Sequence, residues 1–224
     1  MATHREIIYI RAPDGMPDAG CFEVVEAPVP VPGAGQVLVR THYLSIDPYF
    51  RRMMGAGHGQ YANPLKIGDV MVGRGVGVVI ESRHPEFKAG DHVVLAGQGL
   101  RKLPPELQPL SLGLGLIGQS GATAMVGLVD IAHIKAGETV VVSAAAGAVG
   151  SAVGQIARIK GCRAVGIAGG PEKCRHVVAD LGFDACIDYK AGPIGSSLAT
   201  AAPQGVDIYF DNVGGEILDA VLMN

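Results

Sequence analysis

Cysteine is scarce in this 224-residue chain, and the four cysteines stand singly in the sequence, at Cys21, Cys162, Cys174 and Cys186. They show neither the paired spacing of metal ligands nor a disulfide framework, so they favour a reducing, cytoplasmic setting. A strong charge of either sign is also absent. The formal net charge of −3 gives no indication of a nucleic-acid partner or of an anionic membrane surface.

Long hydrophobic runs are missing as well. The first six residues contain no apolar signal core, and the longest apolar tract, residues 140–154, is interrupted by glycines and too short to span a bilayer. We therefore expect no membrane segment. Hydrophobic residues nevertheless make up 48% of the chain against 17% charged residues, which indicates a globular protein and excludes a disordered one. The 33 glycines follow no collagen-like period and indicate many tight turns.

Residues 1–117 predict a β-rich domain. Short β-branched runs alternate there with turns such as Pro28–Gly35 and Lys88–Asp91, without long helices between them. This arrangement is typical of a rolled antiparallel module. The expected strands are Glu6–Ile10, Phe22–Val25, Val37–Leu44, Val70–Ile80 and His92–Leu95.

Residues 118–224 predict an α/β domain. After a helical stretch at Gly121–Ala132, continuous apolar strands alternate with helices, which predicts a doubly wound parallel sheet with right-handed crossovers. The expected strands are Val140–Ser143, Arg163–Ala168, Ala185–Asp188 and Val206–Asp211. The expected helices are Ala148–Lys160, Pro171–Leu181 and Glu216–Met223.

The first strand–turn–helix unit of this second domain carries a dinucleotide fingerprint. Gly147 and Gly150 occupy the second and third glycine places of that pattern, with Ala145 at the first. Small residues are needed there because a pyrophosphate must approach backbone N–H groups at the start of a helix, where the helix dipole favours negative charge. A simple tight turn is the alternative, and the βαβ context favours the nucleotide site.

The end of the second strand bears on which dinucleotide binds. NAD sites usually place an acidic residue there to hold the ribose 2′-hydroxyl. Here the strand ends at Ala168 and is followed by Gly169 and Gly170, while Lys173 comes one helical turn later. Without a carboxylate there is no repulsion against a 2′-phosphate, and Lys173 supplies a cation for it. The sequence therefore favours NADPH. The alternative that Lys173 is a solvent-exposed helix lysine without a ligand stays open.

Six segments make the chain resemble the medium-chain dehydrogenase/reductase superfamily, and within it the zinc-independent prostaglandin reductase/leukotriene B4 12-hydroxydehydrogenase group. The segments are Ser45–Arg51, Lys135–Thr139, Ala144–Gly150, Gly169–Cys174, Ile187–Lys190 and Asp211–Gly215. The resemblance implies a GroES-like β domain followed by a Rossmann domain. It also implies NADP contacts at Gly147, Ala148, Val149, Gly150, Lys173, Tyr189 and Asn212.

Two of these implied contacts keep a structural alternative. Tyr189 follows the third strand, where its hydroxyl can add a donor near a 2′-phosphate, but it also suits a half-buried residue at a strand end. Asn212 ends the fourth strand at the edge where ligands bind in open α/β sheets, but it also suits a turn.

The residues argue against a catalytic zinc ion. Such a site needs Cys, His and acidic ligands with one open position. No Gly-His-Glu run exists, and His58 has no carboxylate beside it. Zinc-dependent relatives place a ligand cysteine shortly before the aspartate that matches Asp47, whereas Leu44-Ser45-Ile46 occupies that stretch here. We expect no metal site.

The resemblance implies reduction of the C=C bond of an α,β-unsaturated aldehyde or ketone. Hydride from NADPH adds to the β-carbon, and the developing enolate then needs a hydrogen-bond donor and a proton. Tyr61 matches a family tyrosine near the nicotinamide and is the catalytic candidate, with a packed loop tyrosine as the alternative. Tyr49 and Arg51 either shape the cleft or tie their loop to the β domain.

The chain departs from the family pattern in two places. A pocket-lining segment is expected to be deleted after Gly97, and the Rossmann sheet is expected to be truncated after its fourth strand, since Asn224 follows soon after. Two other functions therefore stay open: an NADPH quinone oxidoreductase, and a catalytically silent nucleotide-binding fragment. Homodimerisation is a further expectation from the family.

Overall fold

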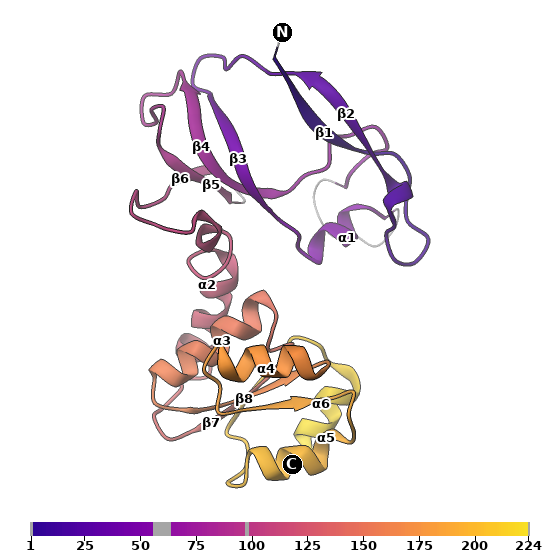
Figure 1. Cartoon of the computed structure of the whole chain (residues 1–224), viewed down its shortest axis with the longest axis vertical. Coiled ribbons are helices and arrows are strands. Elements are labelled where there is room, and N and C mark those ends of the chain that lie inside the picture. The colour runs from indigo at the N-terminus through magenta and orange to yellow at the C-terminus, as the bar shows by residue number, and fades with distance from the viewer. Residues whose placement is uncertain (1, 56–63, 97–98, 224) are drawn as a thin grey trace. The chain divides into compact units, whose positions relative to one another are not determined.

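The computed structural model describes residues 2–55, 64–96 and 99–223, and the chain divides into two compact units, Met1–Leu114 and Gly115–Asn224 (Figure 1). The expected domain boundary at residue 117 lies three residues beyond this division. None of the described helices has the length and apolar character needed to cross a membrane.

The first unit holds two antiparallel sheets. Strand β1 (Thr3–Tyr9) pairs with β2 (Phe22–Pro28). The second sheet has the order β3-β4-β5-β6, formed by Val37–Ser45, Arg74–Ser82, His92–Ala96 and Gly99–Lys102. The helical segments are η1 (Ala19–Cys21), α1 (Tyr49–Met53) and η2 (Leu110–Gly113). The antiparallel β-rich module expected from the sequence is confirmed.

A repeated glycine turn leads into several strands. Before β5, the Lys88 N–H donates to the Asp91 carboxylate at 3.0 Å, and the Asp91 N–H donates back to the Lys88 carbonyl at 3.1 Å. Gly90 takes a φ of +92° between them, a conformation that favours glycine. The same pattern of lysine, glycine with positive φ and acid occurs at residues 66–69 and 135–138. The acid caps each turn just before the chain becomes extended.

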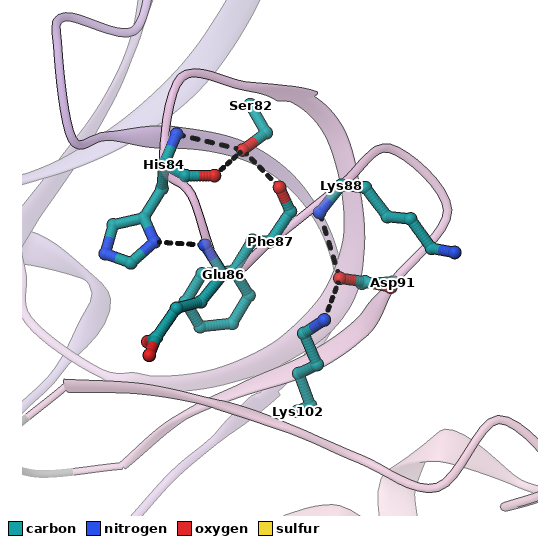
Figure 2. Close-up of polar contacts among 7 residues, drawn as sticks. All are labelled: Ser82, His84, Glu86, Phe87, Lys88, Asp91 and Lys102. Carbon is teal, nitrogen blue, oxygen red and sulfur yellow. Dashed lines mark hydrogen bonds and ion pairs between the residues drawn. The ribbon is translucent and has the colours of Figure 1, made fainter.

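Side chains from neighbouring elements complete the turn before β5 (Figure 2). Lys102 of β6 places its Nζ 2.8 Å from Asp91, and this hydrogen bond is the main reason why the pKa of Asp91 lies below its usual range. On the other side of the loop, the Ser82 hydroxyl donates to the Phe87 carbonyl at 2.7 Å and accepts the His84 N–H at 3.1 Å. These contacts fix the connection between β4 and β5.

The second unit is built on a parallel sheet. The strands β7 (Thr139–Ser143), β8 (Arg163–Ala168), β9 (Ala185–Asp188) and β10 (Ile208–Phe210) lie in the order β10-β7-β8-β9, and every pairing is parallel. The helices are α2 (Gln119–Met125), the π-helical segment η3 (Val126–Ile131), α3 (Ala148–Ile159), α4 (Pro171–Ala179), α5 (Ile194–Ala201) and α6 (Gly215–Leu222). This is the Rossmann arrangement expected from the sequence.

Helices cover both faces of this sheet. Val140 and Val142 of β7 pack with α2, α3 and α4 in one buried cluster, whereas Val141 points to the opposite face. There it packs with Leu198 of α5 and Val221 of α6. Figure 1 shows α3 and α4 on one side of the strands and α5 and α6 on the other. A strand covered on both faces has no polar side, which explains its continuous apolar sequence.

Two elements differ from the expectation because the chain bends where the pattern continues. The expected strand Val70–Ile80 is β4 (Arg74–Ser82), while Val70 forms only an isolated bridge with Ile8 of β1. The chain crosses from one sheet to the other between them. The expected helix Gly121–Ala132 is α2 followed by the wider π-helical turn of η3, where the Phe210 ring lies against Gly127.

Besides the short segments η1 and η2, three elements were not expected: α1, α5 and β6. The first is five residues long, and α5 is built from small residues, with Ser196 and Ser197 bonded back to the Pro193 carbonyl. Strand β6 follows directly on the point where a family segment was expected to be deleted, and it pairs antiparallel with β5. Helix α1 and strand β6 are too short to show a hydrophobic period, whereas α5 carries one at Ile194, Leu198 and Ala201 that was not recognised.

Candidate nucleotide-binding site

The order of the parallel strands defines where a ligand binds in this unit. From β7 the chain proceeds through α3 to β8 on one side and returns through α5 to β10 on the other side of β7. Helix α3, which follows β7, covers one face of the sheet, and α6, which follows β10, covers the opposite face. In open α/β sheets, the crevice outside the carboxyl ends of two such strands is the ligand site. Ser143 and Phe210 are the last residues of these two strands.

The turn after β7 is compact and bent toward the helix. Ala144 adopts a φ of +50°, which is uncommon for a residue with a side chain. Ala145, at the first glycine place of the fingerprint, is completely buried, and its N–H donates to the Ile167 carbonyl of β8 at 3.1 Å. The Gly147 N–H donates to the Ala144 carbonyl at 2.8 Å. The turn is thus held by its own backbone and by the neighbouring strand.

The two glycines of the fingerprint are required by close backbone approach. A Cβ atom on Gly150 would lie 2.3 Å from the Ala144 carbonyl oxygen, and one on Gly147 would lie 3.0 Å from the same atom. The first of these distances is impossible without moving the backbone, and the second is tight. The sequence prediction named these positions for close approach, and the geometry gives the neighbour that each glycine meets.

The start of α3 has the form of an anion site. Gly147 precedes the helix and offers no side chain to cap it, and Ala148, Val149 and Gly150 are its first three residues. The first N–H groups of any helix lack partners within the helix. Gly147 and Ala148 are exposed, so these groups can be approached from solvent. The turn fits a pyrophosphate, because its small residues permit close approach and the first N–H groups of α3 have no side-chain cap.

A second glycine turn follows β8. Gly170 precedes α4 with a φ of +97°, and its N–H donates to the Asp188 carboxylate at 2.8 Å. The Lys190 N–H donates to the same oxygen at 3.0 Å. These two backbone hydrogen bonds hold the pKa of Asp188 below its usual range, and the bond from Gly170 contributes most to this shift. Asp188 therefore orders this turn, a role that the sequence did not indicate.

Tyr189 and Lys173 flank this second turn. The Tyr189 ring packs on Gly169, where an added Cβ would lie 2.8 Å from the ring carbons and from the hydroxyl oxygen. Tyr189 as a whole is 43% exposed, so it stays partly accessible from solvent. Lys173 lies exposed in the first turn of α4 and has no ion-pair partner in the described part of the chain. The structure brings Tyr189 to the glycine turn and leaves the Lys173 ammonium open.

A polar network joins the ends of β7 and β10. The Asn212 side-chain amide donates to the Ser143 carbonyl at 2.9 Å, and the Asn212 backbone N–H donates to the Ser143 hydroxyl at 2.8 Å. That hydroxyl in turn donates to the Asp211 carboxylate at 3.1 Å. Asn212 therefore lies where the carboxyl ends of β7 and β10 meet, with its amide nitrogen bonded to the Ser143 carbonyl.

Asp211 is the centre of this network. One of its oxygens also accepts hydrogen bonds from the Tyr209 hydroxyl at 2.9 Å and from the Val213 and Gly214 N–H groups at 3.0 and 2.9 Å. Burial raises the pKa of Asp211, but the Gly214 and Val213 hydrogen bonds prevail and hold it below its usual range. Burial is also the main cause that raises the pKa of Tyr209 to about 12. The sequence prediction named Asn212 and missed Asp211.

Replacing Asp211 by asparagine is expected to lower the free energy of unfolding at pH 7 by about 1 kcal/mol, a figure that allows for solvent exposure. Because folding lowers the pKa of this carboxyl, its contribution is complete above the ordinary value of 3.8 and is lost as pH falls through the depressed one. The difference from the wild type should therefore shrink below pH 3.8 in urea melts. Asp219→Asn, an exposed position on α6, is the matched control and should change stability little. A difference that grows toward acid pH would contradict this account.

The other sequence-named residues lie elsewhere in the chain or outside the described residues. Tyr61, the catalytic candidate, and His58 lie outside the described residues. Arg51 of α1 donates to the Gly15 carbonyl at 2.7 Å, so it ties its loop to the β-rich unit. Within the described ranges, no group of three or more His, Cys, Asp or Glu side chains is placed to hold a metal ion.

The fold defines a two-unit protein whose second unit is a Rossmann-type parallel sheet, and comparison with known proteins agrees. Residues 5–103 match the family described as the N-terminal domain of oxidoreductase, and residues 148–223 match the family described as zinc-binding dehydrogenase. The chain thus belongs to the medium-chain dehydrogenase/reductase superfamily, in the group that contains the curcumin and prostaglandin reductases. The resemblance stated from the sequence is confirmed.

Individual relatives are similar over nearly the whole chain. The NADPH-dependent curcumin reductase of Escherichia coli K12 is 47% identical over 98% of the chain, and mouse prostaglandin reductase 1 is 45% identical over 94%. The crystal structure of CurA from Vibrio vulnificus in complex with NADPH is 43% identical over 98%, with a TM-score of 0.88. The chain spans about two thirds of these proteins: 66%, 65% and 68% of their respective lengths.

Proposed function

We propose that this protein is an NADPH-dependent oxidoreductase that reduces the C=C bond of α,β-unsaturated aldehydes and ketones. The observation that carries the proposal is the uncapped start of α3 at Gly147, combined with a second strand that ends in Gly169 and Gly170 in place of an acid. Lys173, which follows that turn, is exposed and has no ion-pair partner among the described residues. The similarity to a curcumin reductase and to prostaglandin reductase 1 supports the same reaction class. NADPH, when bound, supplies the hydride.

Each described site residue then has a binding role. The first N–H groups of α3 hold the pyrophosphate, and Lys173 holds the 2′-phosphate of the adenosine ribose, with the Tyr189 hydroxyl as an additional donor. Asn212, fixed through Ser143, forms the wall of the crevice at the end of β10. Tyr61 is proposed as the donor near the nicotinamide. No metal ion takes part in the proposed reaction. The proposed location is the cytoplasm, and the proposed oligomeric state is a homodimer. Sedimentation velocity tests the oligomeric state.

The proposal is tested by titrating the protein with NADPH and with NADH and by assaying three substrate classes. We expect NADPH to bind more tightly than NADH, and NADPH to be consumed with 2-alkenals and enones but not with quinones. Product analysis by mass spectrometry should show saturation of the C=C bond and an intact carbonyl group. Turnover of quinones alone would establish the quinone oxidoreductase, and tight NADPH binding without turnover would establish a silent nucleotide-binding protein. Equal binding of both cofactors would refute the cofactor assignment.

A further inference from the structure

Two of the four cysteines meet beside the second glycine turn. Cys174 lies in the first turn of α4 and Cys186 in β9, and the Cys186 thiol donates to the Cys174 sulfur at an Sγ–Sγ distance of 3.0 Å. Both residues are partly accessible. The other two cysteines are buried and bond to oxygen: Cys162 to the Lys135 carbonyl and Cys21 to Asp18. The contact between Cys174 and Cys186 is therefore distinct within the described chain.

We propose that Cys174 and Cys186 are an oxidisable dithiol, and that a disulfide between them weakens the binding of NADPH. The second part rests on the proposed function. The first part rests on geometry, because a disulfide requires an S–S distance of about 2.05 Å, so the sulfurs have to approach by only about 1 Å.

The oxidation is balanced with a hydroperoxide as the oxidant. The Cys174 thiol reacts with hydrogen peroxide to give a sulfenic acid and water, so that sulfur is oxidised and the peroxide O–O bond is broken. The Cys186 sulfur then attacks the sulfenic sulfur, and the Cys186 proton leaves with the hydroxyl group as a second water. Burial raises the pKa of the Cys186 thiol far above its usual range, so this residue is the protonated donor and Cys174 the acceptor that reacts first.

The consequence for the cofactor follows from what surrounds the two sulfurs. Cys174 directly follows Lys173 on α4, and Cys186 lies two residues before Asp188, which holds the Gly170 N–H. The Gly169–Gly170 turn has no free space into which it can move, since the Tyr189 ring already packs against Gly169. Drawing α4 and β9 together therefore shifts the Lys173 ammonium relative to the 2′-phosphate. NADH, which lacks that phosphate, is affected less.

The test uses a variant in which Cys21 and Cys162 are replaced by alanine, so that only the pair remains. Hydrogen peroxide should lower its mass by two hydrogen atoms, and digestion should yield one linked peptide containing Cys174 and Cys186, which dithiothreitol separates. The additional change Cys186→Ser should abolish the link and leave a Cys174 sulfenic acid that dimedone captures. If the double variant does not fold, the wild-type chain is mapped by the same digestion.

Cofactor titration of the reduced and oxidised forms completes the test. We expect the Kd for NADPH to rise by about fivefold or more, the lower end of usual coupling between sites, with a smaller change for NADH. Failure to form the link overturns the thiol proposal, and a link that leaves the Kd for NADPH unchanged overturns its effect on the cofactor. If the reduced protein binds no NADPH, both the proposed function and the proposed effect of the disulfide on NADPH binding fail. Peptide mapping of the disulfide then still decides whether Cys174 and Cys186 are an oxidisable pair.

Discussion

Replacing Gly150 by alanine is expected to weaken NADPH binding by about tenfold or more, the equivalent of one lost hydrogen bond to a charged group. The added Cβ would lie 2.3 Å from the Ala144 carbonyl oxygen and 2.9 Å from both the Ala144 carbonyl carbon and the Ala145 Cα. All three are backbone atoms of the turn, so no side chain can move aside. The start of α3 must shift away from β7, which displaces the N–H groups that face the pyrophosphate. Overpacking of this kind also costs about 3 kcal/mol of stability.

Titration calorimetry with NADPH and urea unfolding measure the two effects separately. Gly147→Ala should show a weaker version of both, because its Cβ would lie 3.0 Å from the same carbonyl oxygen. Gly192→Ala is the matched control, since nothing lies within 4 Å of its added Cβ. A Gly150→Ala protein that binds NADPH as tightly as the Gly192→Ala protein would contradict the assignment of this turn to the pyrophosphate.

The Rossmann unit was accessible from sequence because its signals are local. Val140, Val141 and Val142 form an unbroken apolar run, and such a run followed by small residues and a helix predicts a buried parallel strand. The positions of Gly147 and Gly150 followed from the same pattern. The structure adds the atom that each glycine meets, the Ala144 carbonyl oxygen, which depends on the positive φ of Ala144. That conformation is not encoded in any residue preference.

Contacts between distant segments were not accessible. Ser143 and Asp211 are 68 residues apart, and their hydrogen bond depends on β7 and β10 being neighbours in the sheet. One local feature of the sequence could have indicated the role of Asp211. Gly214 and Gly215 both take positive φ, and this allows the chain to fold back so that backbone N–H groups reach the Asp211 carboxylate. In the first unit, Asp47 reaches Arg74 across 27 residues, so the point where β4 begins could not be read from its own sequence.

The cysteines illustrate the same limit. Cys174 and Cys186 look isolated in the sequence, and their spacing matches no known disulfide or metal pattern. They meet because α4 packs on β9. A pattern based on neighbours in sequence therefore finds the phosphate turn and misses the thiol pair beside it.

Removing the Lys173 ammonium is expected to change the choice of cofactor. In a Lys173→Ala protein, NADPH binding should weaken by about 10- to 100-fold, because hydrogen bonds to a charged group contribute about 1.5–3 kcal/mol. NADH binding should stay nearly unchanged, since it offers no 2′-phosphate to this side chain. The substitution should be neutral for folding, because Lys173 is exposed and pairs with no acid in the described part of the chain.

The ratio of the two dissociation constants, measured by fluorescence titration at fixed ionic strength, is the quantity that decides this prediction. General loss of positive charge would weaken both cofactors, with only a modestly larger effect on NADPH, because exposed charges are screened by salt. Loss of a direct contact with the 2′-phosphate would weaken NADPH alone. Lys160→Ala is the matched control: it removes an exposed lysine at the opposite end of α3 from the glycine turn and should leave both constants unchanged. Equal weakening of NADPH and NADH in the Lys173→Ala protein would place the 2′-phosphate elsewhere and leave the Gly169–Gly170 turn without its assigned ligand.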